Sequence, residues 1–408
     1  MDAPRVLIVG GGSTGGALAH DLALRGLRVL LVERGELTSG TTGRHHGLLH
    51  SGARYAVNDS ESAAECIAEN RILRRIAPGS FEENGGLFVA LTDEDMDYLP
   101  ALLAGCSSCG IPARRLSPAE ALGLEPGLNP ALKAAVWVPD ATMDAMRLPL
   151  RFFATAERNG AVLRPFTEVT GLLTAGRQVR GVAVRDHLTG ADAELAADLV
   201  VNAVGPWCGR LAAMAGASVP VRPSPGVLVA LVGRLCELVV NRLHPAGDGD
   251  IVVPQRRLSI VGTSAWTVDD PDDLAVPEEH VAAMYREGAK LVPAVASAAE
   301  RAAWSAARPL VGGGFGGLKP SPPRDRECSG AGGGGGRKLS RTFRCFDHAV
   351  TDGVEGLVTI TGGKATTLRA MAEATADLVC RKLGVDAPCR TREVVLLPHT
   401  AYYTGRAA

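Results

Sequence analysis

Aromatic residues are scarce in this chain of 408 residues, where Phe, Trp and Tyr together make up 4% of the sequence. A surface that stacks nucleic-acid bases depends on such side chains. The formal net charge of −1 provides no general attraction for a polyanion. We therefore expect no nucleic-acid partner.

Long apolar runs are also missing, since none approaches the roughly 20 residues that a membrane-spanning helix needs. The N-terminus shows no signal-like segment before its first expected strand. The nine cysteines are scattered, and the spacing of Cys106 and Cys109 is the only close one, which favours reduced thiols and no metal site. These features predict a cytoplasmic protein, and they leave open a peripheral position on the inner face of the membrane.

The N-terminal segment predicts a βαβ unit, with strands over residues 5–9 and 28–32 and a helix over residues 13–25. Between the first strand and the helix, Gly10, Gly12 and Gly15 form the pattern G-x-G-x-x-G. These glycines permit a tight turn and a close approach of the backbone to a pyrophosphate. Glu33 follows Gly15 by 18 residues (33 − 15), where a carboxylate binds ribose hydroxyls. This context predicts a dinucleotide site over the alternative of a plain βαβ turn.

A polar loop follows over residues 39–55 and combines hydroxyls, three histidines and two arginines. Its small and hydroxyl-bearing residues suit a chain that runs along a ribityl-pyrophosphate, which favours FAD over NAD. A solvated loop is the alternative, although Leu48 and Leu49 argue against full exposure. Near the C-terminus, Thr361-Gly362-Gly363-Lys364 precedes an expected helix over residues 366–383 and places a cation at its start, and Gly384 is the expected C-terminal stop of that helix. A nucleotide gripped at both ends of the chain indicates a flavin enzyme.

The remaining elements are predicted from periodicity and turn residues. We expect helices over 144–158 and 277–291, a small antiparallel meander within 162–202, and mostly strands over 219–265. Ser117 and Glu120 form a capping box. Residues 312–336 are rich in glycine and proline, which predicts a flexible insertion.

Long segments of the chain resemble the FAD-dependent glycerol-3-phosphate dehydrogenases, and in particular the catalytic A subunit of the anaerobic three-subunit type. The segments that carry the resemblance are TTGRHHGLLHSGARYAV, SAAECIAEN, VPDATMD, VVNAVGPW, VVPQRRLSIVGTSAWTVD, RPLV and TITGGKATTLRAMAEATADLVCRKLG. They cover roughly residues 5–390 apart from the glycine-rich insertion.

The resemblance implies an α/β protein of the amine-oxidase-like flavoprotein superfamily. It would have a discontinuous, Rossmann-like FAD-binding domain with an inserted α+β substrate domain. We expect the FAD-binding domain to comprise residues 1–80, 143–218 and 346–390, and the substrate domain to comprise 81–142 and 219–311. Residues 312–336 would then be an insertion and 391–408 a C-terminal tail.

The resemblance also implies which residues bind FAD. A helix N-terminus and Lys364 would stabilise the negative charge of a reduced flavin. His46 would contact the flavin, and covalent attachment of such a histidine to FAD is an alternative. The expected cofactor-binding residues are Gly10, Gly12, Ser13, Thr14, Gly15, Glu33, Arg34, Thr41, Thr42, His46, Gly205, Trp207, Gly362, Gly363, Lys364 and Ala365.

The implied reaction is oxidation of sn-glycerol 3-phosphate to dihydroxyacetone phosphate, with hydride transfer from C2 to flavin N5. A dianionic substrate needs several fixed cations, and the expected substrate-binding residues are Arg54, Tyr55, Arg308 and Arg341. The expected catalytic residues are His50, Arg308 and Lys364, with His50 as base or electrostatic partner. Electrons would pass to a quinone or to a partner subunit that transfers electrons or anchors the enzyme to the membrane.

Three alternatives remain open on the sequence. The chain could be a related flavin oxidase or dehydrogenase of an amino acid or 2-hydroxy acid, although its surplus of cations argues against this. It could be a catalytically impaired flavin-binding subunit, because the insertion falls between Arg308 and Arg341, and the cysteine-rich C-terminal domain of the family is not found before Ala408. The third alternative is a soluble NAD dehydrogenase, although the polar loop and the Gly-Gly-Lys turn would have no role in such an enzyme.

Overall fold

The computed structural model describes residues 3–312 and 342–404, which form two compact units. The first unit contains the described residues of Met1–Gly43, Met146–Pro223 and Arg308–Ala408. The second contains Arg44–Ala145 and Ser224–Ala307. Each unit is built from segments that lie far apart in the sequence.

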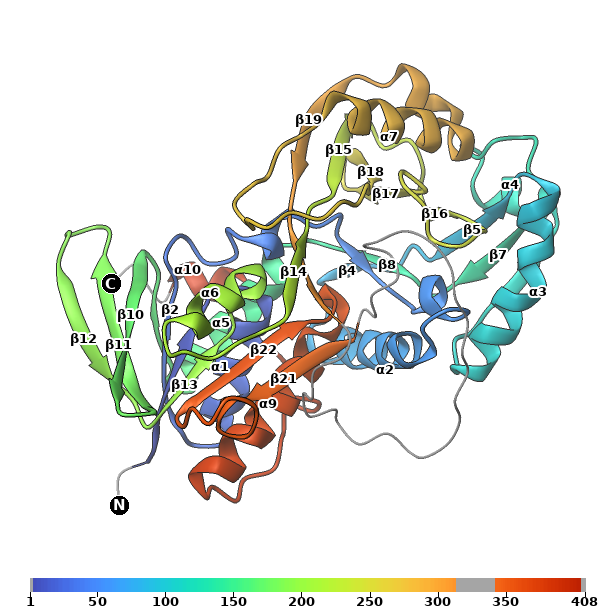
Figure 1. Cartoon of the computed structure of the whole chain (residues 1–408). Coiled ribbons are helices and arrows are strands. Elements are labelled where there is room, and N and C mark those ends of the chain that lie inside the picture. Colours follow the sequence, from blue (N-terminus) through green and yellow to red (C-terminus); the bar gives the residue numbers. More distant parts are fainter. Residues whose placement is uncertain (1–2, 313–341, 405–408) are drawn as a thin grey trace. The chain divides into compact units, whose positions relative to one another are not determined.

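The first unit is organised around a six-stranded sheet with the order β21-β22-β13-β1-β2-β9 (Figure 1). Its neighbouring strands are parallel except for the antiparallel pair β21–β22. A sheet covered on both faces reads as continuous apolar runs, as in the VLIV of β1. The strands are β1 (Arg5–Val9), β2 (Arg28–Val32), β9 (Val162–Arg164), β13 (Leu199–Asn202), β21 (Phe343–Asp347) and β22 (Leu357–Gly362).

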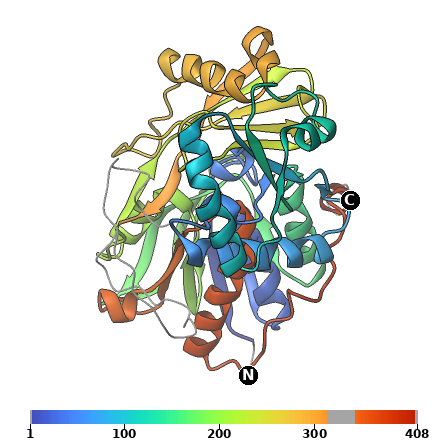
Figure 2. The same cartoon turned by 90° about the vertical axis from the view of Figure 1, so that its right-hand side faces the viewer.

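Helices cover one face of this sheet, and an antiparallel meander covers the other. The helix α1 (Ser13–Leu24) packs between α5 (Arg147–Arg158) and α9 (Leu368–Leu383), as the turned view in Figure 2 also shows. The meander places Val182 and Val184 in one apolar cluster with Leu7 and Val200 of the sheet. Its strands are β10 (Thr167–Ala175), β11 (Gln178–Asp186) and β12 (Asp192–Ala196).

Shorter elements complete the first unit and carry several of its turns. They are η1 (Thr41–Arg44, which ends at the boundary), η3 (Gly205–Trp207), α6 (Cys208–Ala213), β14 (Val221–Ser224), β20 (Arg308–Val311), α8 (His348–Thr351), η5 (Ala365–Thr367) and α10 (Thr400–Thr404).

The second unit contains an eight-stranded mixed sheet with the order β19-β15-β18-β17-β16-β5-β7-β6. Its strands are β5 (Gly86–Ala90), β6 (Arg114–Leu116), β7 (Ala134–Val138), β15 (Val227–Val232), β16 (Val239–Arg242), β17 (Ile251–Gln255), β18 (Leu258–Gly262) and β19 (Glu300–Ser305). The other elements of this unit are η2 (Ala53–Tyr55), α2 (Ser60–Ile76), α3 (Asp93–Ser108), α4 (Pro118–Leu124), α7 (Glu278–Leu291), η4 (Pro293–Ser297) and the small sheet of β3 (Leu48–Leu49), β8 (Ala141–Met143) and β4 (Phe81–Glu82).

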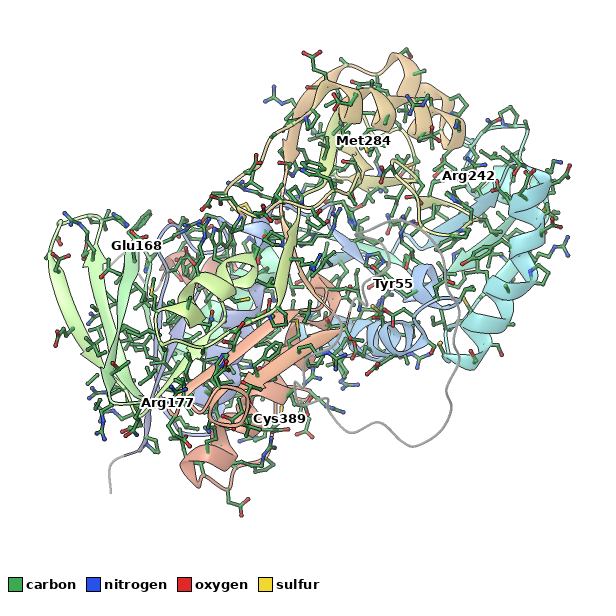
Figure 3. All side chains as sticks on the ribbon, viewed as in Figure 1. Tyr55, Glu168, Arg177, Arg242, Met284 and Cys389 are labelled. Carbon is green, nitrogen blue, oxygen red and sulfur yellow. The ribbon has the colours of Figure 1, made fainter. Side chains whose placement is uncertain are left out.

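Alternating side chains of β5 show how this larger sheet is covered. Leu87 and Val89 belong to an apolar cluster with Met284 of α7, which Figure 3 labels. Phe88 belongs to a second cluster with Ile67 of α2 and with residues of α3. Since successive side chains of a strand point to opposite faces, helices cover both faces of the sheet around β5.

The units differ from the expected domains in two ways. Residues 219–223 and 308–311 lie in the first unit, and residues 44–80 and 143–145 lie in the second. Residues 44–80 belong to the second unit because β3 pairs with β8 and Ile67 of α2 packs against Phe88. The expected helix at residue 144 begins at Arg147 and the one at residue 366 begins at Leu368. The Ser117–Glu120 capping box and the C-terminal stop at Gly384, with φ of 66°, are confirmed.

Two expectations fall outside the described residues. Arg341 and most of the predicted insertion, residues 313–336, belong to the range 313–341, which the structure leaves undescribed. Within the described ranges, no helix has both the length and the apolar character of a membrane span.

Helix α1 contains a histidine that is fully buried in the first unit. The side chain of His20 is 0% exposed, and neither ring nitrogen has a hydrogen-bond partner among the described residues. Its ring packs edge-on against Phe152 with 5.8 Å between centroids. Burial lowers the pKa of His20 to about 4. The folded state therefore holds this histidine neutral.

Stability should fall as the pH is lowered through the window between the two pKa values of this residue. In the unfolded chain His20 becomes protonated as the pH falls through 6.5, whereas in the folded state it becomes protonated only near pH 4. Between pH 7.5 and 4.5, His20 should lower the free energy of unfolding by about 2–3 kcal/mol. His20→Leu should remove this loss in urea unfolding, whereas His187→Gln at an exposed position should retain it. Equal losses for wild type and His20→Leu would contradict the assignment.

Candidate functional site

A glycine turn joins β1 to α1 at a point where no side chain fits. Gly10 has φ of +113°, and a Cβ there would lie 2.6 Å from the carbonyl oxygen of Ala203. A Cβ on Gly15 would lie 2.0 Å from the carbonyl oxygen of Gly10. The glycines thus allow α1 to begin directly against the end of β1.

The N-terminus of α1 is suited to an anion. Gly12, at the N-cap, provides no side-chain cap, and the Ser13 N–H donates to Thr42 Oγ1 at 2.9 Å. Thr42 therefore lies at the first turn of the helix. The unshared N–H groups and the helix dipole favour phosphate at such an end.

The carboxylate of Glu33 lies beside the glycine turn. Its Oε2 accepts from the Gly11 N–H at 2.7 Å, and its Oε1 accepts from the Gly35 N–H at 2.9 Å. The next side chain, Arg34, lies over the ring of Trp207 at 4.5 Å from the centroid. This cation–π contact brings η3 to the end of β2.

The C-terminal Gly-Gly-Lys turn adopts a conformation that only glycine accepts readily. Gly362 and Gly363 have φ of +85° and +71°, and a Cβ on Gly363 would lie 2.5 Å from Met371 Sδ. The Lys364 N–H donates to Thr367 Oγ1 at 3.1 Å, and Ala365 begins η5 ahead of α9. The first helical turn is therefore a 3₁₀ turn, followed by α9.

Met371 connects the two ends of the chain at this place. Thr14 Oγ1 lies 3.9 Å from Met371 Sδ, the same atom that faces Gly363. The starts of α1 and α9 are therefore neighbours, although they are more than 350 residues apart in the sequence. The two expected cofactor-binding segments are therefore adjacent, and their binding of one cofactor stays a prediction.

The strand of Arg308 belongs to the same unit. β20 lies against both η3 and β22, and Val311 is 3.4 Å from the position of a Cβ on Gly362. Thr361 Oγ1 reaches the carbonyl oxygen of Gly205 at 3.5 Å. Of the expected cofactor residues, only His46 lies in the second unit.

In the second unit, His46, His50 and Tyr55 belong to one segment, and the ring of His50 lies next to the rings of both other residues. The ring centroids of His46 and His50 are 5.7 Å apart, and those of His50 and Tyr55 are 5.5 Å apart. Tyr55, labelled in Figure 3, belongs to η2. Asp140 accepts from the Ser51 N–H at 2.6 Å, which fixes the backbone next to His50.

Arg54 directly precedes Tyr55 in the sequence, and its side chain is paired with the carboxylate of Asp250. Its Nη2 forms an ion pair with Asp250, and its Nη1 lies 3.5 Å from Asn241 Oδ1. Burial works against the charge of Arg54, but Asp250 outweighs it and raises the pKa of Arg54. The cation is therefore permanent and held in one orientation.

Four residues of this arrangement were not foreseen from the sequence: Asp250, Asn241, Asn70 and Gln255. Each contacts the segment of residues 46–54 from another element. No local pattern marks them, because their partners lie from 20 to 209 positions away.

Cys106, one of the two closely spaced cysteines, is a free thiol. Burial raises the pKa of this thiol to about 12, which disfavours the reactive thiolate.

The comparison with protein families matches residues 5–396 to the DAO model, described as FAD dependent oxidoreductase. The chain belongs to this family of FAD-dependent oxidoreductases. This membership selects FAD over NAD as the cofactor and establishes that the chain is an oxidoreductase.

Relatives in this family cover nearly the whole chain. It is 44% identical over 393 residues to the A subunit of the anaerobic glycerol-3-phosphate dehydrogenase of Escherichia coli K12, a match that covers 96% of this chain and 69% of the relative. It is 46% identical over 402 residues to the A1 subunit of the same type of enzyme from Haloferax volcanii, covering 96% and 66%. The chain thus spans about two thirds of the length of these relatives.

A solved structure confirms the predicted fold class. The glycerol-3-phosphate dehydrogenase of Bacillus halodurans, complexed with FAD, matches with a TM-score of 0.70 at 23% identity, over 99% of this chain and 70% of that one. At this identity the match shows the fold alone. Within this chain, the glycine turn, the start of α1 and the carboxylate of Glu33 fit the pyrophosphate and ribose of FAD.

Gly15→Ala should disrupt FAD binding, because its Cβ would lie 2.0 Å from a backbone oxygen. Overpacking of this kind costs about 1–3 kcal/mol, so the dissociation constant for FAD should rise roughly 5- to 150-fold. Fluorescence titration of the apoprotein measures this constant. Gly123→Ala in α4, where a Cβ meets nothing within 4 Å, is the matched control and should leave the constant unchanged. Normal affinity in Gly15→Ala would refute the placement of the phosphates.

Proposed function

We propose that this chain is the catalytic subunit of a glycerol-3-phosphate dehydrogenase, which oxidises sn-glycerol 3-phosphate to dihydroxyacetone phosphate. The observation that carries the proposal is the identity of 44% to 46%, over 96% of the chain, with relatives named as the A or A1 subunit of an anaerobic glycerol-3-phosphate dehydrogenase. A substrate-specific reaction depends on many side chains, and the match at this level covers 96% of the chain.

FAD, when bound, supplies the acceptor for the two electrons and the hydrogen that leave C2 of the substrate. The phosphates of FAD would lie at the start of α1, and Glu33 would bind a ribose. The start of α9 with Lys364 would favour the negative charge that accompanies reduction. These contributions position and stabilise charge without any covalent step by the protein.

The substrate phosphate would be bound by arginines. We assign this role to Arg54 and Arg308, with Tyr55 as a further contact. A guanidinium carries five N–H donors, so the pairing of Arg54 with Asp250 is compatible with binding a phosphate as well. Asp250 keeps this side chain in place before the substrate arrives, which reduces the entropy lost on binding.

The hydroxyl proton of the substrate needs an acceptor when C2 is oxidised. We assign this role to His50, because its backbone is fixed through Ser51 and its ring lies between those of His46 and Tyr55. A neutral imidazole can take the proton as the C2–O bond becomes a carbonyl. One proton and one hydride equivalent then leave the substrate, which balances the oxidation.

The enzyme would pass its electrons to a partner. The relatives are each named as one subunit of an enzyme, so we propose electron-transfer or membrane-anchoring partner subunits, with a quinone as the final acceptor. A peripheral position at the inner face of the cell membrane would follow from such partners.

Anaerobic reduction tests the proposal directly. The purified protein should show a flavin absorption band at about 450 nm. Reduction of the flavin by sn-glycerol 3-phosphate should bleach this band. Dihydroxyacetone phosphate should form in equal amount to the flavin reduced. A band that stays unbleached with this substrate but bleaches with an amino acid or a 2-hydroxy acid would overturn the substrate assignment.

Arg308→Ala should mainly weaken substrate binding. Loss of one partner of a buried charged hydrogen bond costs about 2–4 kcal/mol, so KM should rise roughly 30- to 800-fold. Arg301→Ala, at an exposed position on β19, is the control and should leave KM unchanged. An unchanged KM in Arg308→Ala would remove this residue from the phosphate site.

A further inference from the structure

The side-chain amides of Gln255 and Asn70 bind the segment of residues 46–51, here called the histidine segment, which carries His46 and His50. Neither amide has a role in the chemistry proposed above. The segment contains β3, which pairs with β8 through only two residue pairs, Leu48 with Thr142 and Leu49 with Ala141. So short a ladder sets its register weakly. A slip by one residue would turn each side chain of the segment to the opposite face. Additional contacts must therefore fix the histidines.

Gln255 binds one end of this ladder. Its Nε2 donates to the carbonyl oxygens of His46 at 3.2 Å, Gly47 at 3.1 Å and Met143 at 3.0 Å. The first two carbonyls belong to the histidine segment and the third ends β8. Gly47 has φ of +76°, and a Cβ there would lie 1.9 Å from Gln255 Nε2. The glycine therefore permits the amide to reach the backbone.

Asn70 binds the other end in the same way. Its Nδ2 lies 3.4 Å from the carbonyl oxygen of Leu49, 3.1 Å from that of His50 and 3.4 Å from that of Pro139. Again two carbonyls belong to the histidine segment and one flanks β8. The side chain of Asn70 is 2% exposed, so water cannot replace these bonds at low cost.

We propose that Gln255 and Asn70 are positioning residues that fix His46 and His50 by binding the carbonyl of each histidine to the flanks of β8. The two act on different histidines, since Gln255 binds the carbonyl of His46 and Asn70 binds that of His50. This inference rests on the expected contact of His46 with FAD and on the role proposed above for His50 toward the substrate.

Isosteric carboxylates provide a sharp test, because they keep the volume and replace the donating NH₂ by an oxygen. In Gln255→Glu and Asn70→Asp, the new carboxyl faces three carbonyl oxygens, which raises its pKa and leaves it charged and repelled at higher pH. Gln178→Glu is the matched control. Gln178 is the other glutamine of the chain, is exposed on β11, and uses its Oε1 to accept from Arg180, which a glutamate retains.

Three measurements on the holoenzyme and its apoprotein distinguish positioning from a general effect on stability. Hydrogen exchange of residues 46–51, followed by mass spectrometry, should accelerate in both variants and not in Gln178→Glu. The dissociation constant for FAD should rise about tenfold in Gln255→Glu at pH 8, equivalent to one lost hydrogen bond. It should rise less at pH 6, where the carboxyl is protonated and can donate. Asn70→Asp should bind FAD within about twofold of wild type.

The rate of flavin reduction by sn-glycerol 3-phosphate should fall about tenfold in Asn70→Asp, with a shifted pH profile. Lower melting temperatures with unchanged exchange, FAD affinity and pH profile would overturn the proposal. If wild type is not reduced by this substrate, the proposed function fails, while exchange and FAD affinity still decide the positioning roles. Gln255 is half-buried, so Gln255→Glu carries the test alone if Asn70→Asp does not fold.

Discussion

The parallel pairing of β1 with β13, and of β13 with β22, is the constraint on which the candidate cofactor site depends. It aligns the carboxyl ends of three strands that come from the beginning, the middle and the end of the chain. The turns that leave those ends, at Gly10, Gly205 and Gly362, therefore lie at one edge of the sheet. Nucleotides bind at such an edge because helix N-termini and backbone N–H groups meet there.

Close packing at this edge explains why glycine occupies so many of its positions. Gly10 approaches the backbone of Ala203, Gly15 approaches Gly10, and Gly363 approaches Met371. Each contact joins a turn to a neighbouring element at a distance that excludes a Cβ. The same close packing keeps Cβ atoms out of the turn, which suits this edge to the phosphate binding proposed above.

In the second unit, buried partners hold charged and titratable side chains in place along residues 46–54, a segment with little regular structure. Arg54 is fixed by Asp250, and the backbone around His50 is fixed by Asp140 and Asn70. These partners are buried, where hydrogen bonds and ion pairs are stronger and unpaired groups are costly. A polar loop can therefore be as well defined as a strand when every anchor lies in the core.

Local patterns in the sequence determined the βαβ unit, the Ser117 capping box, the stop at Gly384 and the glycine turn beside Glu33, because each depends on residues a few positions apart. The long segments shared with a known family determined the cofactor. The tertiary structure alone decided that residues 44–80 belong to the second unit, and that Asp250, Asn70 and Gln255 support the histidine segment. Their contacts form between elements far apart in the chain, where sequence spacing carries no information on distance.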